Sequence, residues 1–126
     1  YLVSNNFMNI KYKDFIFISI NFIKNDGAAF NIFSKSTIFL SLVSILSSIT
    51  LIFLILISKN ITLTDRYGLS FILGGSIGNG IDRISNGYVV DFININFVNF
   101  PVFNIADISI NIGFLLLLYN LIRMKK

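Results

Sequence analysis

The chain has 126 residues, of which 55% are hydrophobic and only 13% are charged, and its mean hydropathy is +0.79. Soluble domains carry about 25% charged residues, so this composition excludes an ordinary soluble domain or a disordered chain and indicates one small membrane domain over residues 1–126. The net charge of +4 is scattered without a basic cluster, which disfavours nucleic acid as a partner and favours contact with membrane lipids.

The residue types that the sequence lacks exclude several classes of catalytic and metal-binding site. The sequence contains no Cys, no His and no Glu. Disulfides, thiol nucleophiles, Ser-His-Asp triads and nearly every zinc-type site are therefore excluded, and we expect neither a metal nor a cofactor. Asp, Ser, Lys, Tyr and Arg remain as candidate reactive groups. A Ser-Lys protease is disfavoured because every Lys lies in a polar segment or at a chain end.

The first 35 residues predict a β-structured segment outside the membrane. Apolar and polar residues alternate between Ile18 and Ile23, which predicts a half-buried strand from about Tyr12 to Ile23. Residues 1–35 carry four lysines without a hydrophobic span ahead of them, and the chain begins at Tyr1 instead of Met. We therefore expect that an N-terminal transmembrane helix is missing.

A turn is predicted where this strand ends. Asn25-Asp26-Gly27 is a typical turn sequence, in which the glycine supplies a positive φ. The small pair Ala28-Ala29 follows, just before the first apolar segment. The local interpretation is a turn alone, and the alternative is a turn that leaves room for a ligand.

Three transmembrane helices are predicted, over residues 36–58, 67–84 and 104–122. The first is uncharged and its 23 residues suffice to cross a bilayer. The second is less apolar and carries Gly74 and Gly78 at a spacing that lets membrane helices approach closely. One face of this second helix carries residues three to four positions apart, namely Gly68, Phe71, Gly75, Asn79 and Asp82. We expect this face inside the bundle, because Asp82 and Arg83 need partners or water.

Charge predicts the orientation of these helices. Alternating spans place five basic residues on one side, which is cytoplasmic by the positive-inside tendency: Lys59, Arg66, Arg123, Lys125 and Lys126. The loop over residues 85–103 contains no Lys or Arg and then faces outward as a β-like extracytoplasmic segment.

Two aspartates in apolar surroundings are the best candidates for chemistry. Asp91 falls on the apolar side of the predicted β-like loop, and Asp107 falls in the first turn of the last helix. A pair of close carboxylates shares one proton, so that one acts as base toward water and the other as acid toward an amide carbonyl. The local alternative is structural, with Asn104 as N-cap and Asp107 complementing the helix dipole.

The other polar residues of these segments have structural alternatives as well. Asp82 and Arg83 are more often an ion pair at a helix end, and Asn79 is either an interhelical hydrogen-bonding group or a substrate ligand. Together with the aspartates they allow a second hypothesis, a non-catalytic small membrane protein with a structural polar network. A different intramembrane aspartic protease is disfavoured because there is no Gly-x-Gly-Asp motif.

Four motifs in this order resemble the lipoprotein signal peptidase family, the type II signal peptidases of bacteria. They are Asn25-Asp26-Gly27-Ala28-Ala29-Phe30, the run from Gly74 to Arg83, Val89-Val90-Asp91-Phe92, and the run from Phe100 to Asp107. Four such blocks together are highly specific, and they cover most of the chain. The resemblance implies a helical transmembrane bundle of four helices, three of them present here, with a small β-structured cradle at the outer surface.

The resemblance also implies a function. Its catalytic aspartates fall on Asp91 and Asp107, and its substrate-binding or supporting positions fall on Asn25, Gly27, Ala28, Asn79, Asp82, Arg83 and Asn104. The expected reaction is removal of the signal peptide from a lipid-modified prolipoprotein by cleavage before the lipidated cysteine. The expected location is the bacterial cytoplasmic membrane, with a monomeric enzyme whose active site lies near the extracytoplasmic face.

Overall fold

The computed structural model describes residues 10–14, 17–28 and 32–125. Strands and helices follow one another in the order β1, β2, α1, α2, β3, α3. The chain forms two compact units. A sheet unit contains the described parts of Tyr1–Leu40 together with Asp82–Asn104, and a helical unit contains Ser41–Ile81 with the described part of Ile105–Lys126.

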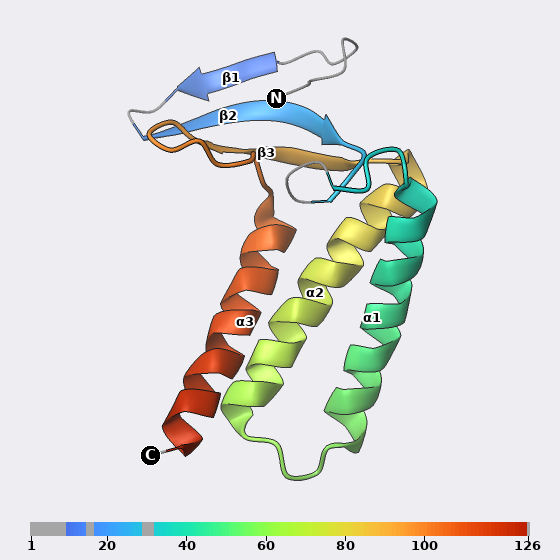
Figure 1. Cartoon of the computed structure of the whole chain (residues 1–126), viewed down its shortest axis with the longest axis vertical. Helices are drawn as coiled ribbons and strands as arrows, with labels where there is room; N and C mark the ends of the chain where they lie inside the picture. The colour runs from blue at the N-terminus through green and yellow to red at the C-terminus, as the bar shows by residue number, and fades with distance from the viewer. Residues whose placement is uncertain (1–9, 15–16, 29–31, 126) are drawn as a thin grey trace. The chain divides into compact units, whose positions relative to one another are not determined.

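The sheet unit is built on an antiparallel sheet in the order β1-β2-β3 (Figure 1). Its strands are β1 (Ile10–Asp14), β2 (Ile18–Asn25) and β3 (Val89–Ile95). The predicted single strand from Tyr12 to Ile23 is therefore wrong. The chain folds back after Asp14, which pairs with Ser19, so the alternation that begins at Ile18 belongs to β2 alone.

One face of the sheet is apolar and also carries Asp91. Ile18 and Ile20 of β2 lie opposite Ile95 and Ile93 of β3, and Asp91 occupies the next position of β3 on the same face. After β3 the chain returns, and the backbone of Phe103 forms a bridge with Ile93. The predicted placement of Asp91 on the apolar side of this segment is confirmed.

The helical unit contains most of α1 (Thr37–Ile57), α2 (Leu63–Asn86) and α3 (Ile105–Met124). The first and last helices match the predicted spans within two residues at each end. Helix α2 begins four residues before the predicted Tyr67 because Thr62 caps it. The Thr62 hydroxyl accepts a hydrogen bond from the Asp65 amide at 3.1 Å and donates one to the Asp65 carboxylate at 3.0 Å.

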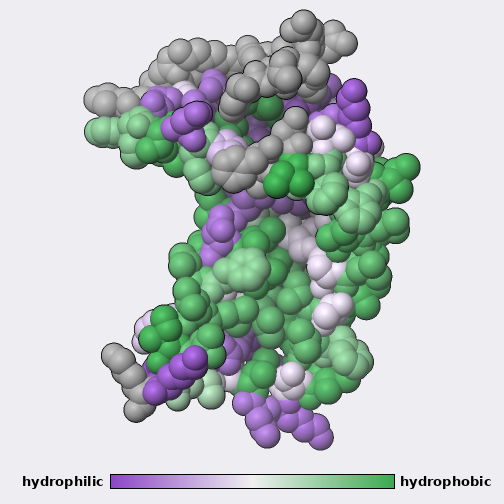
Figure 2. All heavy atoms as spheres, viewed as in Figure 1, coloured by the Kyte–Doolittle hydropathy of each residue, from purple (hydrophilic) through white to green (hydrophobic). Residues whose placement is uncertain are grey.

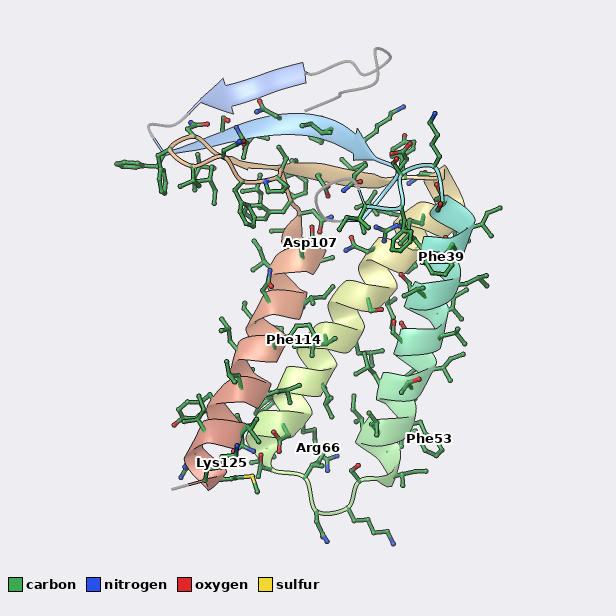
Figure 3. The ribbon with its side chains drawn as sticks, viewed as in Figure 1. Phe39, Phe53, Arg66, Asp107, Phe114 and Lys125 are labelled. Carbon is green, nitrogen blue, oxygen red and sulfur yellow. The ribbon has the colours of Figure 1, made fainter. Side chains whose placement is uncertain are left out.

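Two of the helices are long and apolar enough to cross a membrane. These are α1 and α3, whereas α2, with its glycines, Asn79 and charged residues, is less apolar. Figure 2 shows mainly hydrophobic residues on the visible face of the helical unit. Phe53 and Phe114, labelled in Figure 3, are 60% and 59% exposed, as expected of residues that face lipid.

Glycines let α2 and α3 approach closely. A Cβ atom on Gly75 would collide with the backbone carbonyl of Ala106, and one on Gly68 would lie 3.0 Å from the carbonyl oxygen of Gly113. The predicted role of Gly74 is wrong, because a Cβ there would meet nothing within 4 Å. The contact uses Gly68 and Gly75, which belong to the face predicted to lie inside the bundle, so that prediction is confirmed at these two positions.

Serines join α1 and α2, which lie side by side in Figure 1. The hydroxyls of Ser47 and Ser76 are 2.8 Å apart, and the Ser48 hydroxyl donates to the carbonyl of Ser44 at 2.7 Å. Gly80 brings α2 close at this point, since a Cβ there would lie 3.0 Å from Cβ of Ser44. Helix α2 is therefore held by α1 on one side and by α3 on the other.

Candidate active site

Asp91 is a buried carboxylate with a hydrogen-bond donor on each oxygen. Its side chain is only 3% exposed. The side-chain amide of Asn25 donates to Oδ2 at 2.8 Å, and that of Asn104 donates to Oδ1 at 2.8 Å. Burial penalises a charged carboxylate unless such donors compensate it. The two amides therefore provide what an ionised Asp91 requires.

Asn25 is held in place by the turn that follows β2. Its Oδ1 accepts a hydrogen bond from the backbone amide of Gly27 at 2.9 Å, which fixes its Nδ2 toward Asp91. The guanidinium of Arg83, near the end of α2, donates to the carbonyl oxygen of Gly27 at 2.9 Å. The turn therefore links the arginine to the hydrogen-bond network of Asp91.

Gly27 is required by lack of space, and the prediction that it adopts a positive φ is wrong. Among the described glycines a positive φ occurs at Gly87, where it is 78°. A Cβ on Gly27 would lie 3.0 Å from the carbonyl oxygen of Ile32. That same carbonyl accepts a hydrogen bond of 2.8 Å from the amide of Ala28, which is half-buried. The predicted motif residues Ala29 and Phe30 lie outside the described residues.

Asp107 has its own amide partner. It lies in the first turn of α3, as Figure 3 shows, where the positive end of the helix dipole favours a carboxylate. The side chain of Asn79 is 8% exposed and donates from Nδ2 to Oδ1 of Asp107 at 2.8 Å. Asn79 is one turn beyond Gly75 on α2, so the close approach at Gly75 makes this hydrogen bond possible.

The structure thus groups the predicted site residues around two carboxylates. The sheet unit brings together Asn25, Gly27, Arg83, Asp91 and Asn104, with Ala28 next to them in the turn. The helical unit brings together Asn79 and Asp107. Asp82 is half-buried beside Arg83 in the chain, and its role stays a prediction.

One relationship escaped the sequence analysis: Asn25 and Asn104 share a single carboxylate. The signal lies in the strand register, because Asn25 pairs with Val89 and Asp91 follows two residues later on the same face. That register becomes visible only when β2 and β3 are paired. No local motif around Asn25 contains it.

A sequence profile described as "Signal peptidase (SPase) II" matches residues 1–123 of this chain. The chain belongs to the SPase II family. The resemblance drawn from the four sequence motifs is therefore confirmed.

Individual relatives of this chain support the same family assignment. The chain is 36% identical over 128 residues to the lipoprotein signal peptidase of Enterococcus faecalis, in an alignment that covers the whole chain and 80% of the relative. It is 44% identical over 99 residues to that of Gloeothece citriformis, covering 79% of the chain and 62% of the relative. The chain thus spans less than two thirds of the length of the Gloeothece protein.

Two solved structures share this fold. Both are described as bacterial membrane enzyme structures obtained by the in meso method, one at 2.3 Å and one at 1.9 Å resolution. The first has a TM-score of 0.87 at 31% identity and covers 98% of this chain and 77% of its own. The second has a TM-score of 0.80 at 32% identity and covers 94% of this chain and 78% of its own. The expectation of a membrane enzyme is thereby supported by structure as well as by sequence.

Proposed function

We propose that this chain is an aspartic endopeptidase that removes the signal peptide from diacylglyceryl-modified prolipoproteins and cleaves before the lipidated cysteine. The observation that carries the proposal is that both motif aspartates, Asp91 and Asp107, accept hydrogen bonds from buried asparagine amides. These donors orient each carboxylate before a substrate binds, as the proposed reaction requires. The relatives from Gloeothece and Enterococcus are named lipoprotein signal peptidases, which supports this class of substrate.

The two carboxylates act together in this proposal. Asn104 donates to Asp91, and Asp107 follows Asn104 by only three residues, so the chain itself limits the separation between the two acids. Close carboxylates share one proton, which gives a base and an acid at the same pH. This chemistry needs no metal or cofactor.

Hydrolysis then proceeds by addition of water. The ionised aspartate removes a proton from a water molecule as its oxygen bonds to the carbonyl carbon, and the protonated aspartate gives its proton to the carbonyl oxygen. The resulting gem-diol collapses when the first aspartate passes the captured proton to the amide nitrogen and the C–N bond breaks. The second aspartate recovers its proton from the diol, so the pair returns to its starting state.

The remaining site residues have supporting roles. Asn25 and Asn104 hold Asp91, and Asn79 holds Asp107, so that both carboxylates are oriented before the substrate arrives. Gly27 and Ala28 keep the turn small, and Arg83 fixes its carbonyl. We assign Asp82 to the support of this end of α2.

Membrane placement follows from the helices and their charges. We place α1, α2 and α3 across the bacterial cytoplasmic membrane, with the polar face of α2 covered by α3. Arg66 and Lys125 lie at the end of the helical unit opposite Asp107 in Figure 3, and we assign that end to the cytoplasm. The two aspartates then lie near the extracytoplasmic face, and a single copy of the chain contains both.

The test is cleavage of a diacylglyceryl-modified prolipoprotein in liposomes by the full chain and two variants, Asp91→Asn and Asp107→Asn. We expect the parent to cleave and both variants to lose activity by at least about three orders of magnitude, because each lacks one member of the pair. Asp26→Asn is the matched control, since Asp26 lies in the neighbouring turn. Substantial activity in either dyad variant refutes the assignment of these aspartates.

The non-catalytic hypothesis makes the opposite prediction. If the aspartates only stabilise a polar network, the parent does not cleave, and removing either carboxylate lowers stability because its amide partners lose their acceptor. Thermal unfolding of the same proteins in detergent separates the two hypotheses. Retained stability together with lost turnover supports the peptidase.

A further inference from the structure

Four basic side chains lie at the end of the helical unit that is opposite Asp107, and we call this group the basic end. Lys59 lies in the connection between α1 and α2, and Arg66 lies in the first turn of α2. Arg123 and Lys125 lie where α3 ends. All four residues are exposed, and Figure 3 labels Arg66 and Lys125 at this end. The proposed peptidase reaction uses none of them.

The basic end is not neutralised by acidic side chains. Among the residues that the structure describes, none of these four cations forms an ion pair. The helical unit contains two acidic residues, Asp65 beside the basic end and Asp107 at the other end. Oδ2 of Asp65 accepts hydrogen bonds from Thr62 at 3.0 Å and from Asn120 at 2.8 Å. Four described cations against one carboxylate leave the basic end with a net charge of +3.

The two arginines of the basic end belong to helix ends that are tied together. Besides binding Asp65, Asn120 of α3 donates to the Thr62 hydroxyl at 3.0 Å. Arg66 follows Asp65 directly in α2. Arg123 follows Asn120 by three residues, which is close to one helical turn. The two guanidiniums are therefore carried by neighbouring turns of α2 and α3, so that one ligand between these helix ends can meet both.

The place of Arg66 in its helix points to an anion. A cation in the first turn faces the positive end of the helix dipole, which disfavours it, whereas Arg123 in the last turn of α3 is favoured. Asp65 offsets part of this cost, but one of its oxygens is already engaged by Thr62 and Asn120. An anion bound at Arg66 satisfies both the guanidinium and the N-terminus of α2.

The phosphate of a lipid is the anion that fits this end. A guanidinium offers a planar fork of donors that binds phosphate oxygens in pairs. Exposed apolar and aromatic residues adjoin both arginines, namely Leu63 and Tyr67 on α2 and Tyr119 and Ile122 on α3. Figure 2 shows hydrophilic residues next to hydrophobic ones at this end of the helical unit. Tyrosine and basic residues are common where membrane helices reach the headgroups, and a free phosphate ion would make no use of the apolar surface.

From these observations we propose that the basic end binds the phosphate of an anionic phospholipid, with Arg66 and Arg123 holding one phosphate between them. Lys59 and Lys125 add attraction for an anionic membrane surface. The acyl chains lie against the exposed apolar residues of α2 and α3. The bound lipid joins the start of α2 to the end of α3 from outside, as the buried Asn120 does from inside. The proposal rests on the membrane character of the helices and is independent of the peptidase reaction.

The experiment counts bound lipids by native mass spectrometry of the full chain released from detergent micelles. Phosphatidylglycerol is the probe, and phosphatidylcholine with the same acyl chains is the zwitterionic comparison. We expect the parent to bind phosphatidylglycerol at least about tenfold more tightly than phosphatidylcholine. Arg66→Gln and Arg123→Gln should each weaken phosphatidylglycerol binding about tenfold. The double variant should bind about as weakly as either single variant, because one phosphate needs both arginines.

Lys35→Gln is the matched control. It removes one positive charge from an exposed residue of the sheet unit and should leave the affinity unchanged. Arg66→Lys and Arg123→Lys keep the charge and lose the planar fork, so they should show part of the loss and serve in place of a glutamine variant that does not fold. Phosphatidylglycerol should also raise the midpoint of thermal unfolding of the parent by about 4 °C or more, whereas inorganic phosphate at the same concentration should not.

Four results contradict the proposal. Equal affinity for the two lipids shows that the surface is only apolar. A double variant whose loss is the product of the single losses shows two separate lipids instead of one shared phosphate. Equal stabilisation by inorganic phosphate identifies a site for the free ion, and an equal loss in Lys35→Gln shows that only the net charge matters. None of these results depends on peptide cleavage, so they are distinct from an inactive parent chain, which refutes the proposed peptidase function.

Discussion

Asn104 donates a hydrogen bond of 2.8 Å to Asp91 and is also the last residue of the sheet unit before α3 begins at Ile105. One side chain therefore connects the central carboxylate of β3 to the segment that enters α3. Asp107 is only three residues further along, so a short segment contains both a hydrogen-bond donor to Asp91 and the second aspartate.

Replacing Asn104 by Ala should destabilise the protein. The substitution leaves Oδ1 of Asp91 without this donor inside a buried site, and we expect a loss of about 1–3 kcal/mol in the free energy of unfolding. Thermal unfolding in detergent measures it. Asn99→Ala, in the exposed part of the loop after β3, is the control and should leave the midpoint unchanged.

Replacing the adjacent glycines Gly74 and Gly75 of α2 by Ala should have very different effects on activity and stability. A methyl group on Gly75 meets the backbone carbonyl of Ala106, so Gly75→Ala should push α2 and α3 apart, weaken the hydrogen bond from Asn79 to Asp107 and strongly reduce turnover. Gly74→Ala meets nothing within 4 Å and should be neutral or stabilising by up to about 1 kcal/mol through helix propensity. Equal effects of the two substitutions on activity and unfolding contradict this account of the interface.

A second polar cluster should contribute to stability and not to catalysis. Asn120 of α3 is 5% exposed and donates to Thr62 at 3.0 Å and to Asp65 at 2.8 Å, which ties the end of α3 to the N-terminal cap of α2. Asn120→Ala should lower the unfolding free energy by about 1–2 kcal/mol and leave kcat of the folded protein within a factor of two. Asn111→Ala, exposed on the same helix, is the matched control. A large fall in kcat with unchanged stability would be the contrary result.

The hydrogen bond between the hydroxyls of Ser47 and Ser76 should contribute little to the free energy of unfolding, although the two oxygen atoms are only 2.8 Å apart. Hydrogen bonds between membrane helices average about 0.6 kcal/mol in double-mutant cycles, because the separated helices find other partners. We expect a coupling free energy below about 1 kcal/mol from unfolding of Ser47→Ala, Ser76→Ala and the double variant. A coupling above about 2 kcal/mol would show that this serine pair carries much of the contact between α1 and α2.

Much of the helical architecture could be predicted because long apolar runs determine membrane helices almost alone. The first and last spans were predicted within two residues. The start of α2 was missed, since it depends on capping by Thr62, a single hydroxyl in a polar connection. The hairpin of β1 and β2 was also missed, because strand pairing depends on partners distant in sequence, and alternation in β2 says nothing about where β1 begins.

The sequence predicted which residues belong to the candidate site better than it predicted how those residues contact one another. The motif blocks identified the asparagines and aspartates, but small residues were misjudged at two positions. The small-residue spacing favoured Gly74, whereas the helical period of Gly68, Gly75 and Asn79 correctly placed Gly75 inside the bundle. The lack of space at Gly27 depends on the carbonyl of Ile32, a contact that leaves no local signature in the sequence.

Asn25 and Asn104 lie in the same compact unit as Asp91, to which they donate, and Asn79 lies in the same unit as Asp107. Both units therefore carry asparagine-to-aspartate hydrogen bonds of their own, and these three contacts can form as each unit folds.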